Sequence, residues 1–290
     1  MSLWELLSNL DNVTTENFNV SLTEEEISNI ESSSNHSHLR RFYSQLNDSE
    51  FYEKQREWLL DDKKKSVIES RKAELWNSIT EEIRRPWDNN YLKQWVQYES
   101  KKYMKLSLKI DNDNQNAFEA MCYYFTNDKM FEELDRGYSL RKGLLIIGNV
   151  GTGKTTLMKL FAKNQKSSYE IESCRRLSDK YAIEGVGLLE ENGNIKYCQP
   201  SFTTFLQNNL GICYDDLGTE RNGIRYGDSV NIMEHILLNR YENSKIPFFR
   251  THITTNLTAD EIEQMYGTRV RSRMREMFNT IVLDGKDRRM

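Results

Sequence analysis

The sequence predicts an α/β fold over its second half, preceded by a smaller helical region. From residue 137 onward, short continuous apolar runs alternate with helical patterns, as in parallel sheets covered by helices on both faces. All 14 glycines lie at Gly137 or later, whereas all five tryptophans lie in the first third of the chain. A chain divided in this way is not expected to be one uniform fold.

Residues 1–40 are expected to form an acidic, largely disordered leader, because they are rich in Ser, Asn and Glu. One short amphipathic helix is the exception, since leucines recur at i, i+3, i+4 and i+7. This helix either docks on a partner or folds back on its own domain. The leucines are Leu3, Leu6, Leu7 and Leu10.

Residues 41–128 are expected to form a helical domain that binds a partner. An apolar stripe at helical spacing ends at Pro86, which cannot continue a helix. Two further helical patterns follow, around Trp95 and Met121. Their aromatic side chains are expected to lie in a core.

Composition excludes several classes of protein. No run approaches 18 apolar residues, so no membrane span or membrane partner is expected, and the N-terminus lacks the features of a secretory signal. The four cysteines include no C-x-x-C pair, and His36 and His38 lie in a Ser/Asn tract without further ligands nearby. We therefore expect reduced thiols in a cytoplasmic protein and no metal at these histidines.

Charge is distributed unevenly along the chain. The net charge is −4, with −8 over residues 1–140 and +4 over residues 141–290. Such asymmetry indicates an acidic docking region followed by a basic working end.

The segment GNVGTGKT, residues 148–155, matches the pattern G-x-x-x-x-G-K-[ST] between an apolar run and a helical pattern. Glycines let backbone N–H groups close around phosphate oxygens, and the following helix directs its positive end at them. Lys154 is expected to reach the β- and γ-phosphates of ATP, and Thr155 to bind Mg²⁺. The predicted cradle comprises Gly148, Asn149, Val150, Gly151, Thr152, Gly153, Lys154, Thr155 and Thr156.

Two adjacent carboxylates, Asp215 and Asp216, follow a second apolar run. Buried carboxylates need a positive partner, and Mg²⁺ is the natural one. We expect Asp215 to hold Mg²⁺ through water and Asp216 to orient the attacking water. An ordinary strand-end turn is the alternative interpretation of this pair.

Polar residues after a further strand-like run complete the pattern. Asn256 follows the run THITT and is suited to hydrogen-bond the γ-phosphate or its water, although a capped strand end explains it as well. Four arginines then recur at every second position. At helical spacing the first and third arginines share one face of a helix, and the second and fourth share another. One face is suited to contact the nucleotide of a neighbouring subunit and the other to contact DNA phosphates. A solvated helix with ion-paired side chains is the alternative interpretation of these four arginines. They are Arg269, Arg271, Arg273 and Arg275.

The P-loop, D-D, T-T-N and R-x-x-x-R, in this order, resemble the AAA+ ATPases of the DnaC/IstB type over about residues 130–290. The resemblance implies an AAA+ parallel sheet in a domain spanning 129–290. It makes Asp215 and Asp216 the Walker B pair, Asn256 sensor 1 and Arg273 an arginine finger acting on a neighbouring subunit, with Arg269 as an accessory arginine. It also implies self-association into a ring or spiral, single-stranded DNA as a ligand, and a replicative DNA helicase or a transposase as partner.

The sequence departs from that family at three points. Asp216 stands where many members have Glu, and the N-terminal half matches no motif. The chain is expected to have no C-terminal lid, so only Arg288 or Arg289 is available as a sensor 2 arginine. Residues 125–134 are expected to hold the adenine, because in this fold the base often lies just before the first strand.

DNA contact is a hypothesis on four candidate arginines, each with a solvated surface residue as the alternative. In the initiator branch of AAA+ proteins, extra helices before Walker B bind single-stranded DNA, which points to Arg175 and Arg176 in this chain. The other two candidates lie on the second face of the arginine helix. The candidates are Arg175, Arg176, Arg271 and Arg275.

The sequence is best interpreted as an ATP-dependent DNA replication factor that loads the replicative helicase, with ATP as a switch. An IstB-like partner of a transposase is the first alternative, because the ATPase core does not separate the two. A P-loop small-molecule kinase or a nucleotide-switched adaptor without DNA is the second. The arginine cluster and Asn256 argue against a kinase, which needs a pocket for the acceptor.

Overall fold

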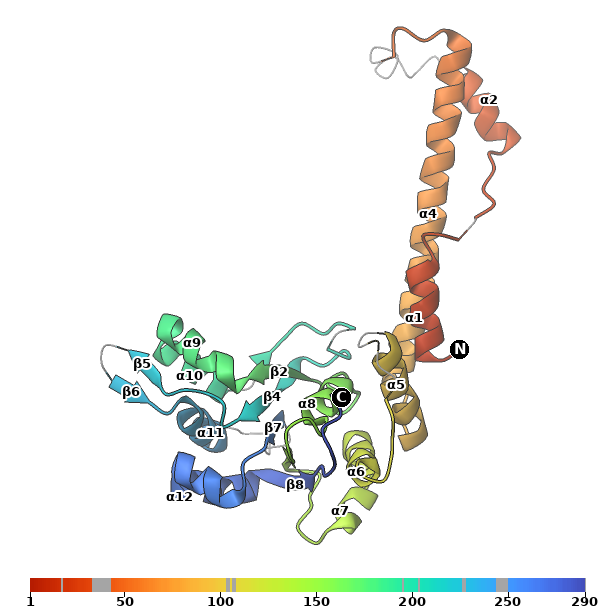
Figure 1. The fold of residues 1–290 in the computed structure, drawn as a ribbon. Coiled ribbons are helices and arrows are strands. Elements are labelled where there is room, and N and C mark those ends of the chain that lie inside the picture. Colours follow the sequence, from red (N-terminus) through yellow and green to blue (C-terminus); the bar gives the residue numbers. More distant parts are fainter. Residues whose placement is uncertain are drawn as a thin grey trace. The chain divides into compact units, whose positions relative to one another are not determined.

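The computed structural model describes residues 1–16, 18–32, 43–102, 105, 108–194, 196–202, 204–225, 228–243 and 250–289. The chain divides into two compact units, Met1–Glu82 and Ile83–Met290 (Figure 1). Each unit has its own buried apolar residues.

The first unit contains α1 (Leu3–Asn12), α2 (Glu24–Ser32) and most of α4 (Asp48–Arg84). A capping box with Glu5 starts α1, and Leu3, Leu6 and Leu7 are buried. The predicted amphipathic helix therefore folds into its own unit. The leader is more helical than expected, because α2 is also present; His36 and His38 lie outside the described residues.

Helix α4 ends at Arg84, two residues before Pro86, as predicted. Leu75 and Ile79 of its apolar stripe are buried, whereas Trp76 of the same stripe is 42% exposed. Lys63 of α4 contacts Glu26 of α2 at 2.5 Å, which ties these two helices together.

The second unit alternates helices with strands. Its helices are α5 (Asn89–Lys102), α6 (Gln115–Thr126), α7 (Met130–Leu134), α8 (Lys154–Phe161), α9 (Cys174–Glu184), α10 (Val186–Gly193), α11 (Ile232–Asn243) and α12 (Ala259–Met277). Its strands are β1 (Gly143–Ile147), β2 (Tyr169–Ser173), β3 (Lys196–Tyr197), β4 (Asn209–Leu217), β5 (Gly223–Arg225), β6 (Asp228–Val230), β7 (Thr251–Thr255) and β8 (Phe278–Val282).

Five strands form a parallel sheet in the order β2-β4-β7-β1-β8. β3 adds an antiparallel pairing to β4, and β5 and β6 form a separate hairpin. The glycine-rich loop follows β1, the carboxylates end β4 and Asn256 follows β7. These groups lie at the carboxyl edge of neighbouring strands, where open α/β sheets bind ligands.

Helices cover both faces of this sheet (Figure 1). Tyr214 and Ile253 share one core with α9, α10, α11 and α12. His252, the neighbour of Ile253 in β7, instead contacts Tyr124 and Phe125 of α6. Since successive strand residues point to opposite faces, α6 covers the face opposite α9–α12. The α/β fold predicted from the sequence, with a helical N-terminal region, is confirmed.

The boundary between the compact units differs from the one drawn at residue 128. Trp87 and Trp95 of the tryptophan-bearing half both contact Phe205 of the second unit, with ring centroids 5.2 and 5.4 Å apart. The indole of Trp95 also donates to the carbonyl of Lys163 at 2.9 Å. The α5–α6 segment thus belongs to the core of the sheet unit.

The described residues after β8, from Leu283 to Arg289, form no helix. No described helix combines the length and the apolar character that crossing a bilayer requires.

Candidate active site

A tight loop joins β1 to α8 and has the geometry of a phosphate cradle. Gly151 and Gly153 have φ values of 82° and 98°, in the left-handed region where a side chain is strained. A Cβ atom on Gly148 would lie 2.1 Å from the carbonyl oxygen of Leu283. Because α8 starts directly after the loop, its first N–H groups face the same space.

Lys154 is anchored on this loop. Its ammonium donates to the carbonyl oxygens of Gly148 and Asn149 at 2.7 and 2.8 Å. Burial lowers the pKa of Lys154, and the carboxylates of Asp216 and Asp215 oppose that effect. A lysine ammonium has three donors, so one remains for a phosphate oxygen.

The next residue, Thr155, contacts Asp215. The threonine hydroxyl lies 2.9 and 3.1 Å from the two carboxylate oxygens. Hydroxyl and carboxylate oxygens are the ligands that Mg²⁺ takes at nucleotide sites. The pair predicted from the sequence is therefore brought together, and its donor set fits a magnesium ion.

Asp216 has an unusual backbone and a perturbed carboxylate. Its φ is 58°, left-handed for a residue with a side chain. Its N–H donates to the hydroxyl of Thr254 at 2.9 Å. Burial, followed by the charge of Asp215, raises the pKa of Asp216. A carboxylate with a raised pKa is a better proton acceptor near neutral pH than an ordinary aspartate.

These groups line a pocket of about 830 Å³, large enough for a nucleotide. Lys154, Thr155, Asp216 and Asn256 all contribute to its wall. Gly148, Asn149 and Asp215 are not in the wall, although each contacts a residue that is. The remaining predicted cradle residues belong to it: Val150, Gly151, Thr152, Gly153 and Thr156.

The sequence did not reveal the opposite wall. Ser100, Leu108, Lys109 and Asn114 line it, rather than the expected segment 125–134. The buried Asn114 side chain orders this turn, because it accepts from the N–H of Asp111 at 2.9 Å and donates to the carbonyl of Lys109. Four lysines between residues 101 and 109 are the only sequence signal in this stretch, and a solvated helix face explains them as well.

The C-terminal tail closes another side of the pocket. The N–H of Arg288 donates to the carbonyl of Gly151 at 2.9 Å, and its guanidinium forms a bidentate pair with Asp111 at 2.7 and 2.8 Å. Arg289 also lines the pocket. Both arginines named from the sequence as sensor 2 candidates are therefore at the site.

The four arginines of α12 lie outside the pocket wall. The helix is broken at Gly267, whose φ of 85° is not helical, and all four arginines follow the break. Arg273 stacks on the Tyr241 ring of α11, with 3.9 Å between guanidinium carbon and ring centroid, and donates to its hydroxyl. Arg269 pairs with Glu242 at 2.8 Å.

Arg271 and Arg275, the two arginines of the second helix face, differ in their contacts. Arg271 is held by two carboxylates of the first α12 segment, Asp260 at 3.3 Å and Glu263 in closer contact. Arg275 is exposed.

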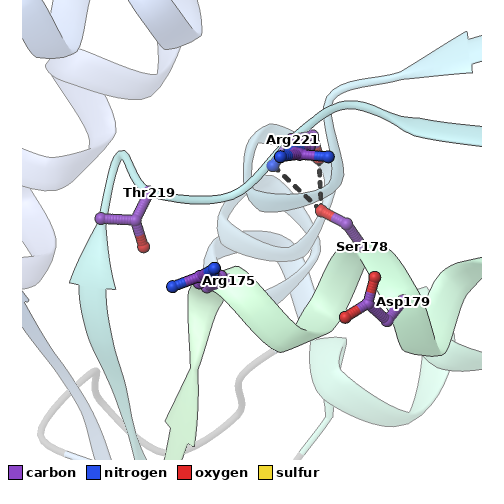
Figure 2. A pocket seen from close by; sticks show the side chains of 5 residues that line it. All are labelled: Arg175, Ser178, Asp179, Thr219 and Arg221. Carbon is purple, nitrogen blue, oxygen red and sulfur yellow. Dashed lines mark hydrogen bonds between the residues drawn. The ribbon is translucent and has the colours of Figure 1, made fainter.

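A second, smaller pocket of about 380 Å³ adjoins the first and shares Thr219 with it. Figure 2 shows Arg175 at the start of α9, and Thr219 and Arg221 on the chain that follows β4. The Ser178 hydroxyl joins the two walls, because it donates to the Arg221 carbonyl at 2.5 Å and accepts from the Arg221 N–H at 3.0 Å. Within the described part of the chain, neither arginine forms an ion pair. Arg176 is exposed but does not line this pocket.

Among known proteins, this chain is similar to a solved structure but to no protein-family model and no curated protein. Among solved structures, the chain is similar to one described as the crystal structure of the DnaC helicase loader, with 20% identity and a TM-score of 0.37. The match covers 61% of this chain and 93% of that chain. A likeness at this identity and TM-score does not show what this chain does.

Proposed function

We propose that this chain binds ATP with Mg²⁺ in the larger pocket and hydrolyses it. One observation carries the proposal: Lys154 and Thr155 lie at the start of a helix, beside Asp215 and Asp216 at the end of β4. A glycine cradle, a lysine, a hydroxyl and two carboxylates are what phosphoryl transfer requires.

Each residue has a separate task in this mechanism. The loop amides and Lys154 hold the phosphate oxygens. Thr155 and Asp215 would hold Mg²⁺, which when bound would supply positive charge beside the phosphates. Asp216 accepts a proton from water or orients it, aided by its raised pKa. Asn256, which lines the pocket, hydrogen-bonds the same water or the phosphate in this proposal.

Nucleotide binding tests this assignment directly. Lys154→Ala should weaken binding of a fluorescent ATP analogue by about a hundredfold, because a charge-assisted contact is lost. Lys159→Ala is the matched control, since Lys159 is an exposed lysine of the same helix. Equal affinity of the two variants would remove the basis for the proposed ATPase.

We further propose that the smaller pocket receives the phosphate backbone of single-stranded DNA. Arg175 and Arg221 supply two cations without an ion-pair partner in the described structure, and Thr219 links them to the nucleotide pocket. Arg176 and Arg275 are exposed and remain candidates. Arg271 is less suited, because Asp260 and Glu263 already neutralise it.

Salt dependence distinguishes this contact from a solvated surface. Arg175→Ala and Arg221→Ala should each weaken binding of a fluorescent oligonucleotide and reduce the logarithmic salt slope by about one. Lys180→Ala serves as control, because Lys180 lies on α9 but is paired with Glu172. Affinity that stays flat from low to moderate salt contradicts the DNA proposal.

The partner proposed is a replicative DNA helicase, on the basis of the motif resemblance alone. The first unit is the proposed docking arm, and Trp76 is an exposed aromatic residue on it. A pull-down with the host's replicative helicase, with and without ATP, tests partner and switch together, with Trp76→Ala as the docking variant. Capture of a transposase instead favours the IstB-like alternative, and ADP formed from an added small acceptor favours a kinase.

A further inference from the structure

The two carboxylates occupy an irregularity in the sheet. Tyr214 pairs with Ile253 and Leu217 with Thr255, so the strands shift register between these pairs. Asp215 and Asp216 together therefore lie opposite the single residue Thr254. This is the arrangement of a β-bulge, which re-aims side chains and is frequent beside active sites.

The bulge explains how both carboxylates reach one site. In a regular strand, consecutive side chains point to opposite faces of the sheet. Here the left-handed φ of 58° at Asp216 changes the direction of the chain. Asp215 reaches Thr155 of α8, while Asp216 lines the pocket.

One hydroxyl contacts both members of the pair. Thr254 is fully buried, and its Oγ1 donates to Asp215 Oδ1 at 2.6 Å while it accepts from the Asp216 N–H at 2.9 Å. The regular hydrogen bonds between β4 and β7 are interrupted at the bulge, and the Thr254 hydroxyl accepts from the Asp216 N–H there. It also fixes one oxygen of the carboxylate that faces Thr155.

We infer that Thr254 is a positioning residue that maintains the bulge and orients both carboxylates for Mg²⁺ and water; the inference rests on the proposed ATPase function. Thr254 does not line the pocket and acts only through its two neighbours. Valine keeps its shape and its β-branch but removes both hydrogen bonds, whereas serine keeps both.

Three measurements on the full chain test this role. In Thr254→Val, the amide of Asp216 should exchange with deuterium about fivefold faster without nucleotide, because its acceptor is gone. The Mg²⁺ concentration for half-maximal ATP hydrolysis should rise about tenfold, because Asp215 loses a charge-assisted hydrogen bond. Binding of the ATP analogue in the absence of Mg²⁺ should stay within about twofold.

The controls separate positioning from general stability. Thr254→Ser should restore the exchange rate and the Mg²⁺ requirement. Thr251→Val removes a buried hydroxyl from the other end of β7, where Thr251 accepts from Arg240, and should lower the melting temperature without changing Mg²⁺ dependence. An unchanged exchange rate or an unchanged Mg²⁺ requirement in Thr254→Val overturns the inference. If the unmodified chain shows no Mg²⁺-dependent nucleotide binding, the proposed function fails, while the exchange measurement still decides whether Thr254 holds the bulge.

Discussion

The nucleotide pocket and the arginine row of α12 are built differently, although both are short polar patterns in the sequence. Thr155, Asp215 and Thr254 are joined by hydrogen bonds of 2.6–3.1 Å in the interior of the sheet unit. Arg269 and Arg273 are held by partners on α11, and the Arg269–Glu242 pair is more than half exposed on both sides.

This difference is what we expect if the pocket residues act within one subunit and Arg273 acts on a neighbouring one. Groups that bind a ligand within the same subunit benefit from rigid, buried supports, because little reorganisation is needed when the ligand arrives. A group that acts on a neighbouring subunit must stay at the surface and be oriented by contacts there. The Arg273 guanidinium satisfies this condition: it lies outside its own pocket wall and is stacked on Tyr241.

The largest effect expected from the arginine row is that of Arg273→Ala. If Arg273 acts in trans, ATP turnover should fall about a thousandfold while binding of ATP is spared. Steady-state hydrolysis with DNA and equilibrium binding measure the two quantities. Mixing Arg273→Ala subunits, which bind ATP, with Lys154→Ala subunits, which retain the arginine, should restore part of the turnover. Normal hydrolysis by Arg273→Ala alone shows that the assignment in trans is wrong.

A smaller effect is expected from the residue that holds the arginine. Tyr241→Ala removes the stacked ring and the hydroxyl contact, and should lower turnover about three- to tenfold without changing ATP affinity. Tyr241→Phe keeps the ring and loses the hydroxyl, which also donates to Glu276 at 2.7 Å, so its effect should be intermediate. If the alanine variant loses ATP binding instead, Tyr241 supports the nucleotide pocket rather than the arginine row.

The same contrast explains what the sequence predicted. Lys154, Thr155 and the aspartates were found because local spacing determines the cradle and the strand end. Thr254 was missed as part of the site because a buried threonine in a strand-like run looks like any other β-branched residue. Leu108 and Lys109 were missed because the chain reaches the pocket there through a turn without periodic pattern. Trp87 and Trp95 were assigned to the helical N-terminal domain by their place in the sequence, but they pack on Phe205 of the sheet unit.

Asp216→Asn tests whether the charge of the Asp216 carboxylate destabilises the folded state. Burial and Asp215 raise the pKa of Asp216, so the charged carboxylate disfavours the folded state. Because the pKa of Asp216 is higher in the folded state than in the unfolded state, protonation of this carboxyl stabilises the fold. That stabilisation is complete below the pKa of the unfolded state and is lost as the pH rises through the pKa of the folded state. Without Mg²⁺ at pH 7, the asparagine variant should therefore have a slightly higher melting temperature; the effect is small because Asp216 is exposed and solvent screens its charge.

The pH dependence identifies the charge as the cause. The stability gained by Asp216→Asn should shrink as pH falls toward about 4, the ordinary range of an aspartate, because the native carboxyl is then protonated. Glu190→Gln, on the exposed surface of α10, should show no such dependence. A gain that is equal at both pH values assigns the effect to the left-handed backbone, which asparagine tolerates well.

The smallest effect is expected at the exposed end of the arginine row. Glu242→Gln removes the partner of Arg269, and surface ion pairs of this exposure contribute about 0–1 kcal/mol. Thermal unfolding should therefore change little, and high salt should abolish the remaining difference. Turnover is the informative quantity, because Glu242 and Tyr241 are consecutive residues that hold two arginines of one helix face. A loss of turnover as large as that of Tyr241→Ala would mean that Arg269 works with Arg273 as one unit, whereas unchanged turnover leaves the stacked Arg273 as the working group of this face.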